Sequence, residues 1–329
     1  MRKQGKMAAV GMVAFLLAAC SSSEGKQATE ADIEAYPNQT IEIYVPASPG
    51  GQTDTAARVM AKHLPKYLGT NIVIVNQATA GGALAFENVR SSDKTGYSLL
   101  FHHQALHTGH AVRQLEHSTN ELTAIGTFSS VNQVFVVSAD SPFDTLDDLV
   151  AFARENPNEV IYGSQIGGTT HFMGELLGLE SDTEIKILDI GSESDRMTGL
   201  LGGQIDLAVT GVGNVLNYIE SGDFKALGVL ADERDELAPE LETTVEQGYD
   251  VQFPIVHSLY GPADMPDEIV QLWNEATEKL AEDEAYNEEL QKTFQQHTLM
   301  NAEETKIFSQ AELEKAQLIA DELFSDTQE

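Results

Sequence analysis

Cysteine is almost absent from this chain, since Cys20 is the only one in 329 residues. A single thiol cannot form an intramolecular disulfide, so the folded state must rely on its hydrophobic core alone. Basic residues are also scarce: 19 lysines and arginines stand against 52 acidic residues, and the formal net charge is −33. Nucleic-acid-binding proteins carry a basic face, so this composition argues against that class of protein.

Long apolar runs are equally rare, and the longest lies at the amino terminus. Three basic residues precede an apolar run at 7–17, which is followed by Ala18 and Ala19. A run of about 11 residues is too short to cross a bilayer, which needs about 20. The pattern is typical of a secretory signal peptide. Because the segment ends in Leu-Ala-Ala-Cys, it resembles the bacterial lipobox, in which the cysteine is lipidated.

We therefore predict a lipoprotein signal peptide at residues 1–19, lipidation of Cys20, and an extracytoplasmic protein on the outer face of the cell membrane or in the periplasm. The alternative is an ordinary signal peptide with an incidental cysteine. Residues 20–35 are small, polar and acidic, and are expected to form a flexible tether.

After the tether, short β-rich runs alternate with helix-length segments, a pattern that predicts an α/β fold with mostly parallel sheets flanked by helices. The predicted strands are 41–46, 71–75, 97–101, 121–128, 134–138, 159–164, 184–190, 206–210 and 225–230. The predicted helices are 53–68, 83–91, 145–155, 170–179, 193–201 and 212–221, with a nearly all-helical region from residue 266 that ends in a long helix at 302–323.

The order of these elements indicates two lobes. Residues 36–140 together with 251–329 are expected to form lobe 1, in which C-terminal helices complete the N-terminal sheet, and residues 141–250 to form lobe 2. Two lobes joined by two chain crossings form a hinge around a cleft.

Four glycine- or serine-containing loops follow predicted strands and precede predicted helices. They lie at residues 46–54, 78–86, 164–172 and 189–195. Glycine lets the backbone approach a ligand closely, and a helix amino terminus offers unsatisfied N–H groups with partial positive charge. Open α/β sheets bind ligands at the carboxyl ends of their strands, where all four loops lie. These features predict a site for carboxylates.

The sequences PASPGGQTD, NQATAGG, DKTGYSLL, YGSQIGGTTHFMGELL and LLGGQIDLAV occur here in the order seen in the Bug family, the TctC-like receptors of tripartite tricarboxylate transporters. The chain resembles that family from about residue 36 to residue 324. The resemblance implies a two-lobed, type II-like periplasmic-binding-protein fold and no enzymatic activity or cofactor. It also implies a monomeric receptor that delivers a small organic acid, a di- or tricarboxylate, to membrane permease subunits.

The resemblance also implies which residues hold the ligand's carboxylate, mainly through main-chain amides. They are Ser48, Pro49, Gly50, Gly51, Thr53 and Asp54 in the first loop, and Ser164, Gly167, Gly168, Thr169 and Thr170 in the third. Expected neighbouring positions are Gly81, Gly82, Gly191, Ser192, Asp206, His257 and Ser258. A structural role is the alternative for Asp206, because a carboxylate facing an anion would repel it. The chain departs from the common family pattern at Gln77, where arginine is common, and at His257, where tryptophan is common.

Five of the nine histidines lie within residues 102–117. His103, His107 and His110 share a helical face and could bind a metal, but no HExxH motif or second cysteine supports this, and we favour ordinary surface or cleft-lining histidines. Ser164 and His171 would be the candidate pair of a hydrolase, which the missing G-x-S-x-G elbow argues against. A receptor that serves a signalling system instead of a permease remains the other alternative.

Overall fold

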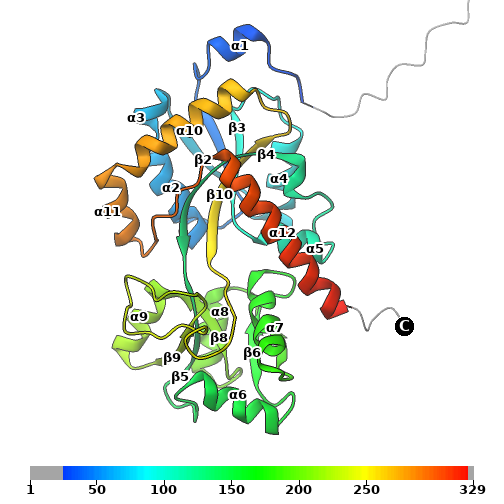
Figure 1. The fold of residues 1–329 in the computed structure, drawn as a ribbon, viewed down its shortest axis with the longest axis vertical. Helices are drawn as coiled ribbons and strands as arrows, with labels where there is room; N and C mark the ends of the chain where they lie inside the picture. Colours follow the sequence, from blue (N-terminus) through cyan, green and yellow to red (C-terminus); the bar gives the residue numbers. More distant parts are fainter. Residues whose placement is uncertain (1–24, 325–329) are drawn as a thin grey trace, which may run out of the picture.

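The computed structural model describes residues 25–324 and arranges them in two lobes, one above the other in Figure 1. Lobe 1 contains a five-stranded sheet in the order β2-β1-β3-β10-β4. Its strands are β1 (Ile41–Val45), β2 (Ile72–Asn76), β3 (Ser98–His102), β4 (Leu122–Val131) and β10 (Ile255–Pro262). Strand β1 pairs in parallel with β2 and β3, whereas β10 runs antiparallel to both β3 and β4.

Helices cover the sheet of lobe 1, and its strands bury apolar side chains beneath them. Ile41, Ile43 and Val45 of β1 are fully buried, as the alternating pattern of β1 predicts. The fully buried Trp273 also belongs to this core, and its Nε1 donates a 2.9 Å hydrogen bond to the Tyr36 hydroxyl. The helices are α1 (Glu30–Glu34), α2 (Gln52–His63), α3 (Pro65–Leu68), α4 (Ala83–Arg90), α5 (Ala105–Ala111), α10 (Asp267–Ala281), α11 (Glu284–Lys292) and α12 (Ala302–Phe324), with short 3-10 turns η1 (Thr79–Gly82) and η2 (Thr119–Glu121).

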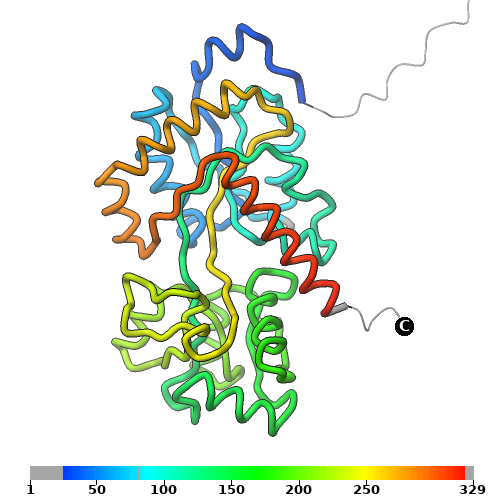
Figure 2. Tube along the Cα trace, in the orientation of Figure 1, coloured from blue at the N-terminus to red at the C-terminus, as the bar shows by residue number. Residues whose placement is uncertain are grey.

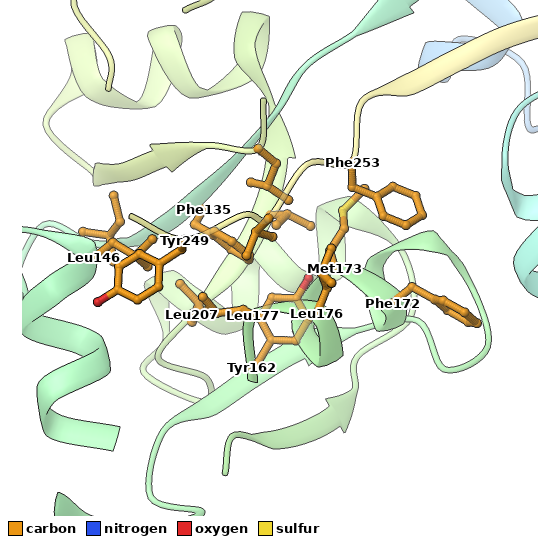
Figure 3. Packing of buried hydrophobic residues seen from close by; sticks show 14 of the residues in the cluster. Phe135, Leu146, Tyr162, Phe172, Met173, Leu176, Leu177, Leu207, Tyr249 and Phe253 are labelled. Atoms are coloured by element: carbon orange, nitrogen blue, oxygen red, sulfur yellow. The ribbon is translucent and has the colours of Figure 1, made fainter. Parts of the chain in front are cut away.

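Lobe 2 contains the sheet β8-β5-β9 and the parallel pair β6-β7, which a bridge between Tyr162 and Leu207 joins to the start of β8. Figure 3 shows part of one cluster of buried side chains in this lobe, among them Phe135, Tyr162 and Leu177. Its strands are β5 (Gln133–Ser138), β6 (Ile161–Ser164), β7 (Lys186–Asp189), β8 (Ala208–Gly211) and β9 (Phe224–Val229), and its helices are α6 (Leu146–Glu155), α7 (Thr169–Ser181), α8 (Glu193–Leu201) and α9 (Val212–Ser221).

Two segments of chain cross between the lobes, and Figure 2 shows them running next to each other. The first crossing is at Asn132, between β4 and β5, and the second leads into β10. We placed the first boundary at residue 140, but β5 pairs with β8 and β9, so the crossing comes earlier. The strands β5 and β10 next to the crossings are also the antiparallel ones, so the sheets are mixed and not mostly parallel as expected.

The C-terminal helix is shared between the lobes. It begins beside β4 in lobe 1, yet Ala316, Ile319 and Ala320 pack into the core of lobe 2. The sequence predicts this helix in lobe 1 alone, whereas in the structure it contacts both lobes.

All nine predicted strands and most predicted helices are present, with ends that differ by a few residues. The sequence missed β10 and α5, and it missed α1 inside the predicted tether, where Thr29 and Asp32 form a capping box. The predicted signal peptide and Cys20 lie outside the described residues. Among residues 25–324, no helix has both the length and the apolar character needed to span a membrane.

Candidate functional site

The first predicted loop joins β1 to α2, and a buried carboxylate fixes its shape. Asp54 is 1% exposed and accepts hydrogen bonds from the Gly50 amide at 2.8 Å, Arg58 Nε at 2.9 Å and Asn76 Nδ2 at 2.8 Å. Burial by itself would raise the pKa of the Asp54 carboxyl, but these hydrogen bonds lower it below its usual value. Asp54 is therefore a support for the loop, and its carboxylate is already occupied.

The glycine amides that we expected to hold a carboxylate are also occupied. The Gly50 amide bonds Asp54, the Gly51 amide bonds the Ser48 carbonyl, and the Gly168 amide bonds the Gln165 carbonyl. The donors left without an acceptor come next in the chain, because the first amides of an α-helix have no partner within the helix. In α2 these are the amides of Gln52, Thr53 and Asp54. Thr53 and Asp54 are among the expected ligand residues, and Gln52 is not.

Four helix starts among the described residues have glycine at the N-cap, and the one at Gly82, before α4, directly follows the η1 turn. Helices α2, α7 and α9 have Gly51, Gly168 and Gly211 at the N-cap, and glycine has no side chain that could accept from the following amides. Helices α6 and α8, by contrast, begin at Thr145 and Ser192, whose side chains form complete capping boxes. Ser192, a predicted ligand residue, is therefore occupied as a helix cap, and the Gly191 amide bonds Asp189.

The uncapped helix starts lie where the lobes touch. A Cβ atom on Gly211 would lie 2.7 Å from Nε2 of Gln52, so the start of α9 in lobe 2 meets the start of α2 in lobe 1. Gly167, just before α7, has φ +78° and packs against Gln114 of lobe 1, whose Nε2 donates to the Ile166 carbonyl at 3.3 Å. Thr169 and Thr170 form the first turn of α7, where Thr170 Oγ1 accepts from the Gln165 amide.

Gly81 and Gly82 close the η1 turn before α4. Gly82 has φ +96°, and a Cβ atom there would lie 2.8 Å from Cβ of Pro46, so only glycine fits. This packing places the second predicted loop directly against the first. Nε2 of His102, at the end of β3, lies 3.8 Å from the same point.

Two predicted ligand residues, Asp206 and Ser258, do not lie at the predicted loops. Asp206 Oδ2 accepts a 2.9 Å hydrogen bond from the amide of Ile161, the first residue of β6. Asp206 therefore lies at the amino end of this strand, whereas the predicted loops lie at the carboxyl ends of their strands. Its role is structural, as the alternative reading had it. Ser258 is 1% exposed and its hydroxyl is 2.8 Å from that of Thr127, inside lobe 1.

The clustered histidines are mostly buried. His102, His107 and His257 are at most 4% exposed, and His257 stacks on Phe101 with a ring separation of 5.7 Å. Burial lowers the pKa of His107 to about 3 and that of His103 to about 4. Within residues 25–324 no group of three or more histidine, cysteine or acidic side chains is placed to hold a metal.

A cavity of about 750 Å³ lies beside both chain crossings. Its lining includes Ser130, Asn132, Pro254, Gln296 and His297, and none of the predicted ligand residues. Gln296 Nε2 in lobe 1 donates to Asp235 Oδ2 in lobe 2 at 2.9 Å, so the lobes are also linked on this side.

Sequence reasoning missed Arg196, a cation of lobe 2 that is 6% exposed. Its Nη1 donates to the Gly191 carbonyl at 2.6 Å, and burial lowers the pKa of its guanidinium. A signal was available, because a basic residue close to the amino terminus of a helix opposes the helix dipole.

The comparisons with known proteins agree with this architecture. Residues 56–324 match the model of the tripartite tricarboxylate transporter family receptor, TctC. A relative from Agrobacterium vitis, named UPF0065 protein in the TAR-I ttuE-ttuC' intergenic region, is 31% identical over 258 residues, which are 76% of this chain and 73% of that protein.

Two solved structures from Rhodopseudomonas palustris share the fold. One, with adipate, has a TM-score of 0.76 at 22% identity and covers 87% of this chain and 98% of its own. The other, MatC with bound malate, has a TM-score of 0.73 at 20% identity and covers 87% of this chain and 100% of its own. The likeness to such structures confirms the predicted two-lobed periplasmic-binding-protein fold. The chain therefore belongs to the tripartite tricarboxylate transporter receptor family, TctC, a family of extracytoplasmic solute-binding receptors and not of enzymes.

Proposed function

We propose that this receptor binds a small di- or tricarboxylate between its lobes and delivers it to the membrane permease of a tripartite transporter. The observation that supports this most directly is the set of three helix starts, α2, α7 and α9, that have glycine at the N-cap. Each has partial positive charge at its start, which favours an anion. The amides of the first turn are free in α2, whereas in α9 the Val212 amide already donates to the Asn132 carbonyl at 3.0 Å. Both lobes contribute to the set, so one anion between them would favour the closed arrangement.

The strength of such contacts is sufficient despite the acidic surface. A hydrogen bond to a charged group contributes about 1.5–3 kcal/mol, and micromolar affinity needs about 8 kcal/mol. Three or four oriented amides therefore supply most of the required free energy. The net charge of −33 is spread over the whole chain, and charges more than about 8–10 Å from the ligand are largely screened at physiological salt.

Matched pairs of acids and amides test the proposal. Titration calorimetry of the mature chain with succinate, malate, adipate and citrate should show binding of at least one acid near or below micromolar Kd, because the free amides need an anionic acceptor. The corresponding diamides, or the triamide of citrate, should not bind. The proposal fails if none of the four acids releases or absorbs heat while the chain is folded.

A charge introduced at the first turn of α2 tests the role of its amides, and the same change on another helix gives the matched control. Gln52→Asp adds a carboxylate that would cap the free amides of α2 and repel the cargo, and it should weaken binding at least tenfold. Gln310→Asp makes the same change on an exposed position of α12 and should leave Kd unchanged.

We also propose that Cys20 anchors the receptor. Two or three acyl chains, each contributing about 0.8 kcal/mol per buried CH₂, would hold it firmly at the membrane. In cells fed labelled palmitate, the wild-type chain should be labelled and sediment with membranes, and Cys20→Ser should be neither labelled nor retained. Membrane retention of the Cys20→Ser chain would argue against this anchor.

A further inference from the structure

Arg196 is a buried cation without a carboxylate partner. The guanidinium is 6% exposed, its Nη1 bonds only the Gly191 carbonyl, and its Nε is buried with no hydrogen-bond partner in the described structure. Three other arginines are paired with carboxylates: Arg58 with Asp54, Arg90 with Glu87 and Arg234 with Glu246, each at 2.8–2.9 Å. Arg196 makes no ion pair among residues 25–324.

The nearest acidic groups are occupied by other partners. Glu193 Oε1 accepts from Asn214 Nδ2 at 2.9 Å and from the Thr210 hydroxyl. Asp195 Oδ2 accepts from the hydroxyl and the amide of Ser192 in the capping box of α8. The carboxylates beside Arg196 in the sequence therefore serve the ends of α8 and α9.

Glu193 and Asp195 attract the guanidinium without forming an ion pair with it, but a buried donor such as Nε that makes no hydrogen bond destabilises a protein unless a further group satisfies it. In a receptor, that further group is the cargo. A guanidinium is well suited, because it stays charged when buried and can hold a carboxylate with two parallel hydrogen bonds.

A second unpartnered group lies at the neighbouring strand end. Ser164 ends β6, is 0% exposed, and its hydroxyl has no hydrogen-bond partner in the described structure. The amide of Ile190 donates to the Ser164 carbonyl at 2.9 Å, so the end of β6 lies directly beside the loop whose Gly191 carbonyl holds Arg196. A cation and a free hydroxyl thus occur together at the carboxyl edge of lobe 2.

We propose that Arg196 and Ser164 form a carboxylate subsite in lobe 2, so that the receptor selects dicarboxylates over monocarboxylates. One carboxylate of the cargo accepts from the free amides at the start of α2 in lobe 1, and the other pairs with Arg196 and accepts from Ser164. The buried histidines of lobe 1 are neutral and supply no charge, so the second negative charge is compensated by Arg196. This subsite rests on the proposed function.

Titration calorimetry with half-amides tests the subsite, since a half-amide keeps the shape of the acid but loses one charge. Wild type should bind succinate or adipate about ten- to hundredfold more tightly than succinamate or adipamate. In Arg196→Met that ratio should fall to near one, in Arg196→Lys it should be partly kept, and Ser164→Ala should lower it only slightly.

Melting temperatures separate a ligand contact from a structural role. Without cargo, Arg196→Met should melt at or above the wild-type temperature, because a buried cation with an unbonded Nε has been removed. A lower melting temperature together with an unchanged acid-to-half-amide ratio would overturn the subsite and leave the proposed function intact. If Arg196→Met does not fold, an unchanged ratio in Arg196→Lys and in Ser164→Ala would overturn it equally. A wild type that binds none of these acids would overturn both proposals.

Discussion

Lowering the pH from 7 to 5 is expected to destabilise the folded chain by several kcal/mol. Burial, reinforced by repulsion among neighbouring imidazoles, holds the pKa of His102 and that of His257 well below the usual value, and lowers that of His107 to about 3. In the unfolded chain these groups titrate near 6.5. The unfolded state therefore binds more protons below that pH, and stability falls as the pH drops from about 6.5 towards the folded-state values.

The size of the expected destabilisation follows from the difference between the pH and the pKa of histidine in the unfolded chain. At pH 5, each histidine that stays neutral costs about 2 kcal/mol, so three of them cost about 6, against a typical total stability of about 5–15 kcal/mol. Relief of repulsion among the 52 acidic residues acts in the opposite direction, but most carboxylates remain ionised until about pH 4. We therefore expect acid unfolding between about pH 4 and 5.

Melting curves followed by circular dichroism between pH 7.5 and 4.5 would measure this. His257→Phe keeps the ring stacked on Phe101 while removing one titrating group, so its melting temperature should fall less steeply than that of wild type. His297 is exposed, and His297→Gln should follow the wild-type curve. A melting temperature that stays constant from pH 7 to pH 5 would contradict the expectation.

Replacing Asp54 with alanine should damage both binding and stability. The carboxylate joins three donors, from Gly50, Arg58 and Asn76, and each would lose this acceptor, although Asn76 Nδ2 would keep the Ala47 carbonyl. We expect the free energy of unfolding to fall by about 3 kcal/mol, because Arg58 is half-exposed and recovers part of its loss in water. The loop before α2 would lose its fixed shape, and cargo affinity should fall at least about tenfold.

Asp148 provides the matched control for this substitution. It also lies in the first turn of a helix, where it accepts from the amides of Asp144 and Thr145, but it is exposed and belongs to α6, away from the loops of the site. Asp148→Ala should lower stability less than Asp54→Ala does, because Asp148 is exposed, and should leave calorimetric affinity unchanged. Equal binding by Asp54→Ala and wild type would show that the loop needs no such support.

The sequence predicted the parts of the fold that depend on local pattern. Strands such as β1 alternate buried and exposed residues, and helices such as α6 begin with a capping box, so both can be read from neighbouring residues. Strand β10 has no such pattern, because all eight of its residues are buried on both faces of the sheet. The first crossing was misplaced for a similar reason: β4 and β5 read as consecutive strands, and only their pairing partners separate them.

The candidate site was predicted in outline and corrected in detail. Glycine-rich loops at strand ends located it, but a sequence does not show which amides are already bonded, as those of Gly50 and Gly168 are. Nor does a sequence show that Asp206 lies at the amino end of β6, opposite to the predicted loops, since that position depends on how the chain folds back onto β6. Arg196 was overlooked because its lack of a carboxylate partner is visible only once burial and neighbours are known.

The position of β10 has a consequence for how the protein assembles as it is made. Lobe 1 needs residues 255–262 between β3 and β4, whereas every strand of lobe 2 comes from residues 133–229. During synthesis from the amino end, all strands of lobe 2 are made before lobe 1 can close its sheet, and only the contacts of α12 with lobe 2 come later. Until then β3 and β4 present open edges, which are prone to pairing with other chains. We therefore expect the second lobe to fold first, and the first lobe to be the one that depends on protection against aggregation.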